Sequence, residues 1–232
     1  MNLLEILRTE LLRATTPAHE RKGIFFKTGP GEYAEHDQFI GVPVPKLREL
    51  VKTYRTLPLK SVLCLLQSPI NEERLLALLM LVERYQKGDA TLKQMIFDLY
   101  QTYIQYVNNW NLVDASAHLI VGAHLHQCDK THLLTLAASD ILWERRIAIV
   151  STWYFIRQKE YDWTIKLAEM LLHDPHDLMH KAVGWMLREA GKRDETILIE
   201  FLDQYANKMP RTMLRYAIEK FSLDRRKDYL LR

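Results

Sequence analysis

Apolar residues recur at intervals of three and four along almost the whole chain, and strict apolar–polar alternation is nearly absent. Two of the clearest stripes are Leu3, Leu4, Leu7, Leu11 and Leu75, Leu78, Leu79, Val82. This spacing places apolar side chains on one face of an α-helix. Short segments that disfavour helices separate the stripes, for example Leu57-Pro58, Ser68-Pro69 and Asp174-Pro175. The pattern predicts an all-helical protein with about a dozen short helices.

One stretch departs from the helical spacing. Residues 27–44 contain Gly29, Pro30, Gly31, Gly41 and Pro43, a composition that predicts a long loop. We expect helices within residues 1–55 on both sides of this loop, and helix-pair repeats from about residue 58 to residue 232. The whole chain, residues 1–232, is then expected to form a single repeat domain.

The second helices of the predicted pairs share a register. Aligned segments place five residues in one column: Arg74, Asp114, Arg146, Lys181 and Arg215. Their successive separations are 40, 32, 35 and 34 residues, a period typical of helix-pair solenoids. Stacked pairs bury faces that a single pair leaves exposed, and their second helices line one curved surface. The predicted fold class is therefore all-α, an α–α superhelix with a concave face.

Four of the five column residues are cations, an arrangement suited to following a chain of phosphates. The alternative for each of them is a structural role, in which the side chain binds helix carbonyls or bridges neighbouring repeats. Asp114 is the exception, and Trp110 lies one helical turn before it on the same face. Trp185 likewise follows Lys181 by four residues. We expect the remaining three tryptophans to lie in the core: Trp143, Trp153 and Trp163.

Composition narrows the function classes only slightly. Hydrophobic residues make up 48% and charged residues 26% of the 232 residues, which indicates a folded globular protein. A net charge of +3 permits an anionic partner without requiring one. The sequence shows no membrane-spanning run and no signal peptide, and we expect a cytoplasmic protein. Cys64 and Cys128 are expected to be reduced core residues, and the spacing of the histidines at 118, 124 and 126 does not suit a metal site.

Three segments, together with an N-terminal one, resemble the AlkD-type family of DNA alkylation repair glycosylases, which are built from HEAT-like repeats. The segments are Asn-Trp-Asn-Leu-Val-Asp (109–114), Leu-Trp-Glu-Arg-Arg-Ile-Ala-Ile (142–149), His-Lys-Ala-Val-Gly-Trp-Met-Leu-Arg-Glu (180–189) and Phe-Ile-Gly-Val-Pro-Val-Pro-Lys-Leu-Arg (39–48). The similarity extends over nearly the whole chain. It implies HEAT-like repeats whose concave face binds DNA.

The resemblance also implies roles for individual residues. The family's catalytic carboxylate corresponds to Asp114, and its cleft tryptophans correspond to Trp110 and Trp185. The cleft arginine corresponds to Arg146, although Arg145 is adjacent. Lys181 and Arg188 are expected to support Arg146 in binding a phosphate. The family also places an N-terminal aromatic residue beside the lesion, for which Phe25, Phe26 and Tyr33 are the candidates; Phe26 is included in the predicted site.

The activity implied is that of a monofunctional glycosylase that needs neither a metal nor a cofactor. Its substrate would be double-stranded DNA containing cationic N3- or N7-alkylated purines, and the protein would be a monomer located in the cytoplasm and associated with the nucleoid when bound to DNA. Two alternatives remain. One is a non-catalytic module that binds distorted or branched DNA, and the other is a protein–protein scaffold. An aspartate among cations favours the glycosylase, because a carboxylate weakens the binding of phosphates. We therefore expect one at this place only where the chemistry requires it.

Overall fold

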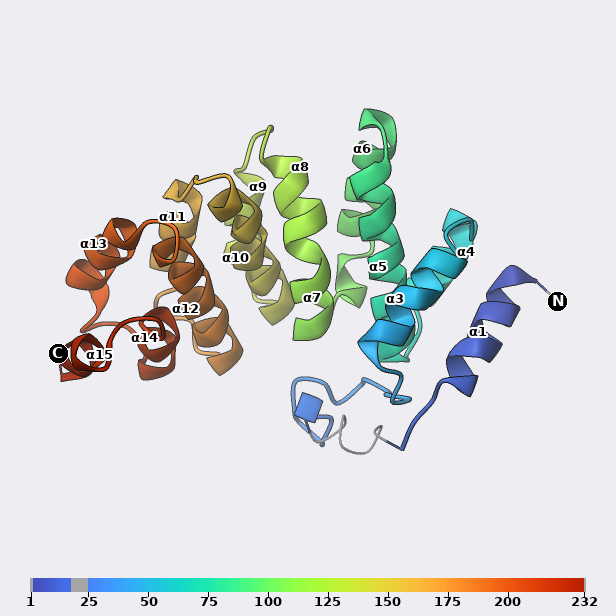
Figure 1. Cartoon of the computed structure of the whole chain (residues 1–232), viewed down its shortest axis with the longest axis horizontal. Helices are drawn as coiled ribbons and strands as arrows, with labels where there is room; N and C mark the ends of the chain where they lie inside the picture. The colour runs from blue at the N-terminus through green and yellow to red at the C-terminus, as the bar shows by residue number, and fades with distance from the viewer. Residues whose placement is uncertain (1, 18–24, 232) are drawn as a thin grey trace. The chain divides into compact units, whose positions relative to one another are not determined.

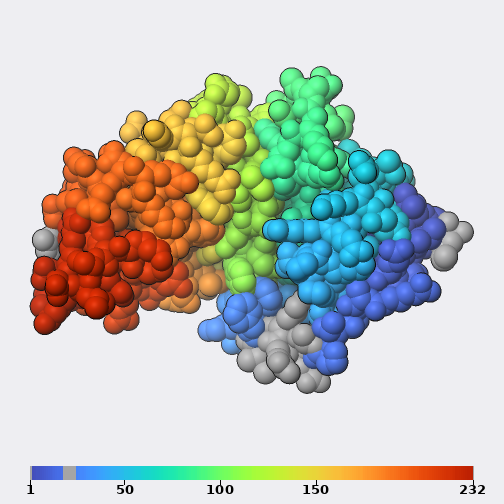
Figure 2. Space-filling view, viewed as in Figure 1, coloured from blue at the N-terminus to red at the C-terminus, as the bar shows by residue number. Residues whose placement is uncertain are grey.

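The computed structural model describes residues 2–17 and 25–231, and these residues are helical without β-strands, as the apolar spacing predicts. The chain forms two compact units, Met1–Ser116 and Ala117–Arg232 (Figure 1). The division falls within a continuous helical segment, where α7 (Trp110–Ala117) runs into a π-helical turn, η2 (His118–Gly122). Figure 2 shows the surface of the chain in the same orientation and with the same colours.

The first unit contains α1 and a series of helices that follow the predicted loop. Their bounds are α1 (Leu3–Arg13), α3 (Val44–Thr53), α4 (Leu59–Leu66), α5 (Asn71–Lys87), α6 (Ala90–Thr102), the 3-10 turn η1 (Ile104–Tyr106) and α7. A capping box between Asn2 and Glu5 fixes the start of α1, and Asp89 caps α6 through the Leu92 amide. The long central helix α5 packs against α3, α4 and α6.

The second unit repeats a pairing of a short helix with a longer one. Its elements are η2, α8 (Ala123–Leu125), α9 (His132–Ala137), α10 (Leu142–Arg157), α11 (Asp162–Met170), α12 (Asp177–Gly191), α13 (Glu195–Tyr205), α14 (Arg211–Ala217) and α15 (Leu223–Leu231). The short helix α9 packs on α10, and α11 packs on α12; α13 packs on α12 as well. The second helices pack in sequence, α10 on α12 and α12 on α14. This arrangement agrees with the predicted helix-pair stacking within this unit.

Glycines allow two close contacts between neighbouring elements of this unit. A Cβ atom at Gly184 of α12 would lie 2.4 Å from the Met213 carbonyl oxygen and 2.6 Å from Tyr216 Cβ on α14. Gly122 of η2 makes a similar contact with α10, because a Cβ atom at Gly122 would lie 2.2 Å from the Ser151 carbonyl oxygen. Backbone atoms cannot move aside as a flexible side chain can, so both positions require glycine.

The predicted loop is present, and α3 begins at its last residue, Val44. It is tied to the start of α5 by backbone hydrogen bonds, from the Gln38 amide to the Pro69 carbonyl (3.1 Å) and from the Asn71 amide to the Gln38 carbonyl (2.8 Å). The Thr16 hydroxyl donates to the Gly41 carbonyl (2.7 Å). The loop is therefore held against the start of α5 and against the segment that follows α1.

Three expectations from the sequence are wrong. Cys64 and Cys128 are exposed rather than buried, because Cys64 lies on the solvent side of α4 and Cys128 lies in the turn that follows α8. The tryptophans expected in the core are only half-buried: Trp143, Trp153 and Trp163. Arg74 does not share the register of the other column residues, since it is the fourth residue of α5, whereas Asp114, Arg146, Lys181 and Arg215 are each the fifth residue of their helices.

No helix among residues 2–17 and 25–231 is both long enough and apolar enough to cross a membrane.

Candidate functional site in the first unit and cationic residues in the second

The first unit contains a cavity of about 350 Å³ that Asp114 lines. Its aromatic side chains are Phe26, Phe39 and Trp110, and its charged ones are Arg48, Glu72 and Asp114. Trp110 and Asp114 are neighbours on α7, one turn apart, as their spacing predicts. Asp114 is half-buried, so its carboxylate reaches the cavity while its helix remains packed in the unit.

Three aromatic rings form a stack at this cavity. The Phe26 ring lies between Phe39 and Trp110, with centroid distances of 4.5 Å and 4.8 Å and interplanar angles of 18° and 15°. Phe25 instead meets Trp110 edge to face at 5.7 Å and is 67% exposed. Tyr33 is not among the described residues that line the cavity. Of the three N-terminal candidates, Phe26 is therefore the one that lies in the cavity.

A buried carboxylate fixes the loop that carries Phe39. Asp37 accepts hydrogen bonds from Asn71 Nδ2 at 2.9 Å and from Asn109 Nδ2 at 2.6 Å, and it pairs with the Arg74 guanidinium. Arg74 is 3% exposed and also donates to the Ser68 carbonyl. Arg74 thus has the structural role considered for the cations of the column. Because α5, α7 and the loop share this one carboxylate, the position of Trp110 depends on that of the loop.

Glu72 attaches the loop at a second point. Its carboxylate accepts the amide protons of Ile40 (3.1 Å) and Gly41 (3.0 Å). Gly41 has a φ of 82°, a left-handed conformation that glycine adopts without strain. Although Glu72 and Asp114 both line the cavity, Glu72 is 2% exposed and holds the loop backbone. Asp114 is therefore the better placed carboxylate to meet a ligand in the cavity.

Tyr100 lies close enough to Asp114 to be affected by its charge. Burial is the main reason that the pKa of Tyr100 lies above its ordinary value, and the negative charge of Asp114 raises it further, against the effect of the hydrogen bond to Ser116. The Tyr100 hydroxyl lies 3.0 Å from Ser116 Oγ on α7. Tyr100 therefore links α6 to the helix of Asp114.

In the second unit, Trp185 belongs to an aromatic cluster. Trp153 of α10 meets it edge to face at 4.9 Å, and the His118 ring lies 4.5 Å from Trp153. The Arg157 guanidinium lies 4.3 Å from the centre of the Trp153 ring, a cation–π contact. Trp153 thus supports Trp185, a role that its helical spacing alone does not indicate.

The predicted cationic residues of the second unit differ in exposure. Arg146 is 5% exposed and donates from Nη1 to the Leu178 carbonyl at 2.6 Å. Arg145 pairs with Asp174 at 2.6 Å and donates to the Ser139 carbonyl at 2.9 Å. Arg188 pairs with Glu219, and its side chain is 15% exposed. Lys181, which is 39% exposed and pairs with Asp177 at 2.7 Å, is the most accessible of the four.

Sequence reasoning missed Phe39, Asp37 and Glu72. Phe39 is the first residue of the segment 39–48 that resembles the family, but the resemblance implies no role for its ring. The two carboxylates act on partners that are 31 to 72 residues away in sequence. No local pattern reports such contacts; the only available signal was the strongly polar start of α5, Asn-Glu-Glu-Arg (71–74), whose side chains are all buried.

The chain is an all-helical protein built from paired helices. Its first unit contains a cavity that is lined by aromatic and carboxylate side chains. The chain belongs to the DNA alkylation repair enzyme family, whose model matches residues 7–221. A solved structure titled "Predicted DNA alkylation repair enzyme from Enterococcus faecalis" is similar in fold, with a TM-score of 0.67, 17% sequence identity, and coverage of 90% of this chain and 97% of that chain. No curated protein matches this chain.

Within the part of the chain that the structure describes, no group of three or more His, Cys, Asp or Glu side chains is arranged to hold a metal ion.

Proposed function

We propose that the protein is a monofunctional DNA glycosylase that hydrolyses the N-glycosidic bond of cationic N3- or N7-alkylated purines in duplex DNA. Membership of the alkylation repair family supports the substrate class. The observation that carries the specific activity is the position of Asp114, a half-buried carboxylate in a cavity lined by Phe26, Phe39 and Trp110.

This reaction requires few catalytic groups. An alkylated purine of this kind already carries a positive charge, so it can leave without protonation. As the bond between C1′ and the base nitrogen breaks, its electron pair neutralises the base, and positive charge develops on the sugar. Asp114 would stabilise this oxocarbenium-like sugar and orient the water that attacks C1′. The water proton then passes to the carboxylate or to solvent. The Trp110 ring adds attraction for positive charge through its quadrupole.

Aromatic rings and a carboxylate also supply selectivity. Both attract a cation and neither offers a neutral base a comparable interaction, so discrimination does not require an enclosing pocket. The cations of the second unit would bind the DNA backbone, with Lys181 the most accessible and Arg146, Arg145 and Arg188 acting mainly through the helices that they hold. Trp185 would offer a ring face to the sugar or to a cationic group, supported by Trp153.

The test is release of free 3-methyladenine and 7-methylguanine from methylated duplex DNA. Asp114→Asn should lower the excision rate about 10²- to 10³-fold, the range for removal of one electrostatic contact to a transition state, while binding to the same DNA is largely retained. Asp98→Asn on α6, which removes a carboxylate bonded to Gln94 at 2.8 Å, is the matched control and should excise at the wild-type rate.

Each outcome separates the proposal from its alternatives. Release by the wild type and by Asp98→Asn, but not by Asp114→Asn, supports the glycosylase and its carboxylate. Tight DNA binding with no release by any form would support the non-catalytic module that binds distorted or branched DNA. Equal loss of binding and excision in Asp114→Asn would contradict the catalytic role of this residue.

A further inference from the structure

Charge in the second unit is divided between the two kinds of helix. The first helices α11 and α13 carry five carboxylates and one lysine: Asp162, Glu169, Glu195, Glu200, Asp203 and Lys166. The second helices α10, α12 and α14 carry seven Lys or Arg residues and three carboxylates. The corresponding first helices of the other unit, α4 and α6, carry two lysines and one carboxylate between them. The negative charge is therefore a property of α11 and α13, and not of first helices in general.

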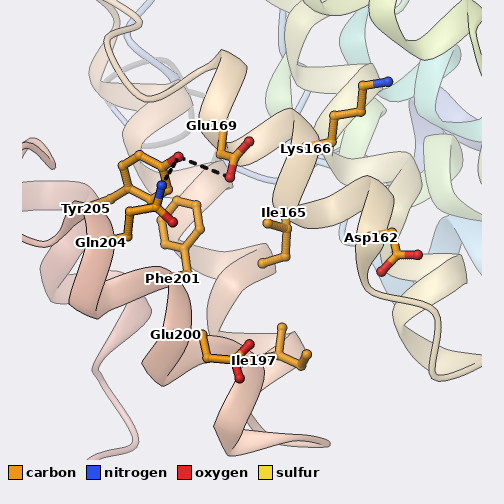
Figure 3. Close-up of a pocket in the computed structure, with 9 residues that line it drawn as sticks. All are labelled: Asp162, Ile165, Lys166, Glu169, Ile197, Glu200, Phe201, Gln204 and Tyr205. Carbon is orange, nitrogen blue, oxygen red and sulfur yellow. Dashed lines mark hydrogen bonds between the residues drawn. The ribbon is translucent and has the colours of Figure 1, made fainter.

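A groove of about 430 Å³ lies between these two acidic helices. Figure 3 shows its side chains, with Ile165 from α11 and Ile197 and Phe201 from α13 turned toward the space between the helices. Ile165 and Ile197 are half-buried, so they remain accessible. The acidic side chains that line the groove are all exposed: Asp162, Glu169 and Glu200. The surface thus combines an apolar floor with a negative rim.

The groove has a defined end and few cations. Tyr205 of α13 donates to Glu169 of α11 at 3.2 Å, and Gln204 donates to the Tyr205 hydroxyl at 2.9 Å (Figure 3). Lys166 lines the groove, with its ammonium group 4.9 Å from the centre of the Trp163 ring on its own helix. Lys208 lies 5.8 Å from the Tyr205 ring at the closed end. The three lining carboxylates therefore outnumber the one lining cation.

We propose that this groove is a docking surface for a basic amphipathic helix of a partner protein. DNA is excluded as the occupant by its charge, because phosphates are repelled by the acidic rim. A helix with apolar side chains on one face and Lys or Arg on its flanks complements both the floor and the rim. α11 and α13 have 9 and 11 residues, so the groove is about 14–16 Å long. That length accommodates apolar side chains at positions i, i+3 or i+4, and i+7 of a bound helix.

This inference does not depend on the glycosylase activity. The groove is formed by α11 and α13, whereas the residues proposed for DNA binding in the second unit lie on α10 and α12. Substitutions in the groove should therefore leave excision of methylated bases at the wild-type rate. Measuring peptide binding and excision on the same proteins therefore distinguishes the failure of this inference from the failure of the proposed function.

The test uses a fluorescent synthetic helix with leucines at i, i+3, i+4 and i+7 and lysines on its flanks, a scrambled peptide of the same composition, and a peptide with glutamates in place of the lysines. Anisotropy measures their binding to the full chain. We expect the Leu/Lys helix to bind and the other two not to bind. Glu200→Lys and Ile197→Asp should each weaken binding at least about fivefold, and the matched exposed control Asp228→Lys on α15 should not.

Several results would overturn the proposal. They are absence of binding by the Leu/Lys helix, equal binding of the scrambled peptide, and equal weakening by Asp228→Lys. Light scattering that shows a dimer broken by Ile197→Asp would assign the groove to a second copy of this chain instead. Circular dichroism and the urea unfolding midpoint establish that each variant is folded, so a loss of peptide binding then reports on the groove itself.

Discussion

Phe25 and Phe26 are adjacent in the chain but have different surroundings. Phe26 is 8% exposed and stacks on two rings, whereas Phe25 is 67% exposed and meets its neighbours only edge to face. A stacked pair contributes about 0.5–1.5 kcal/mol beyond the area that it buries. The central ring of the stack takes part in two such pairs, and the position of Trp110 at the candidate site depends on one of them.

Phe26→Leu should therefore lower the free energy of unfolding by about 1–3 kcal/mol, through the loss of both stacked contacts. Phe25→Leu should change it by less than about 0.5 kcal/mol, as surface substitutions usually do. Urea unfolding of the two variants measures the difference. Phe26→Leu should also slow excision more than Phe25→Leu does, because Trp110 loses its stacked neighbour. Equal destabilisation by the two substitutions would contradict the arrangement of the rings.

At the scale of single helices, the start of α12 depends on a histidine. His176 is the N-cap, and its Nδ1 accepts the Leu178 amide proton at 3.1 Å. Burial lowers the pKa of His176 below its ordinary value, and the neighbouring charge of Asp174 partly opposes this effect. Protonation of Nδ1 would remove the acceptor that caps the helix. The helix that carries Lys181 and Trp185 is therefore stabilised by a neutral imidazole.

The direction of the pH dependence follows from the lowered pKa. As pH falls below about 6.5, the ordinary pKa of histidine, the unfolded chain binds a proton at His176 before the folded protein does, so stability decreases between that pH and the lower folded pKa. His176→Asn keeps a capping oxygen but does not titrate. Its urea unfolding midpoint should fall less between pH 7.5 and pH 5.5 than that of the wild type. Equal falls would show that His176 does not contribute.

The crossing of α12 and α14 allows a prediction in which two effects oppose each other. Within a helix, replacing glycine by alanine stabilises by about 1 kcal/mol through backbone entropy. At Gly184 the new Cβ would lie 2.4 Å from the Met213 carbonyl oxygen, and overpacking of this kind costs about 1–3 kcal/mol. The helix-propensity gain is therefore outweighed, and Gly184→Ala should lower the urea midpoint. Gly29→Ala, whose Cβ would meet only the flexible Glu32 side chain, is the control and should change the midpoint little.

The same helices show what the sequence could and could not predict. Apolar spacing was sufficient to predict the helices, and the glycines and prolines were sufficient to predict the loop before Val44, because both depend on local residue order. The predicted register was wrong only for Arg74. Arg74 is the fourth residue of its helix, whereas Arg146 and the other column residues are each the fifth residue of theirs. The burial of Asn71, Glu72 and Arg74 could not be predicted, since it results from the loop residues 37–41 folding over the first turn of α5.

At the scale of the whole molecule, the net charge of +3 is the sum of two larger charges of opposite sign in different parts of the chain. α11 and α13 together carry −4, from five carboxylates and one lysine, so the remainder of the chain carries +7. A modest total charge is thus compatible with a surface that binds phosphates and another that repels them. The composition alone does not indicate this division, because it depends on which helix carries each charge.

This division predicts how the salt dependence of DNA binding responds to single lysines. Each phosphate contact releases condensed counterions and contributes about 0.9 to the slope of log K against log salt concentration. Lys181 on α12 is the most accessible of the predicted phosphate contacts, so Lys181→Gln should weaken binding and reduce the slope by about this amount. Lys166→Gln on the acidic helix α11 removes the same charge and should leave the slope unchanged. Binding measured from 50 to 200 mM salt for the three proteins provides the comparison. Equal reductions for both variants would show that DNA is not confined to the second helices, because only the long-range charge of the protein would then matter.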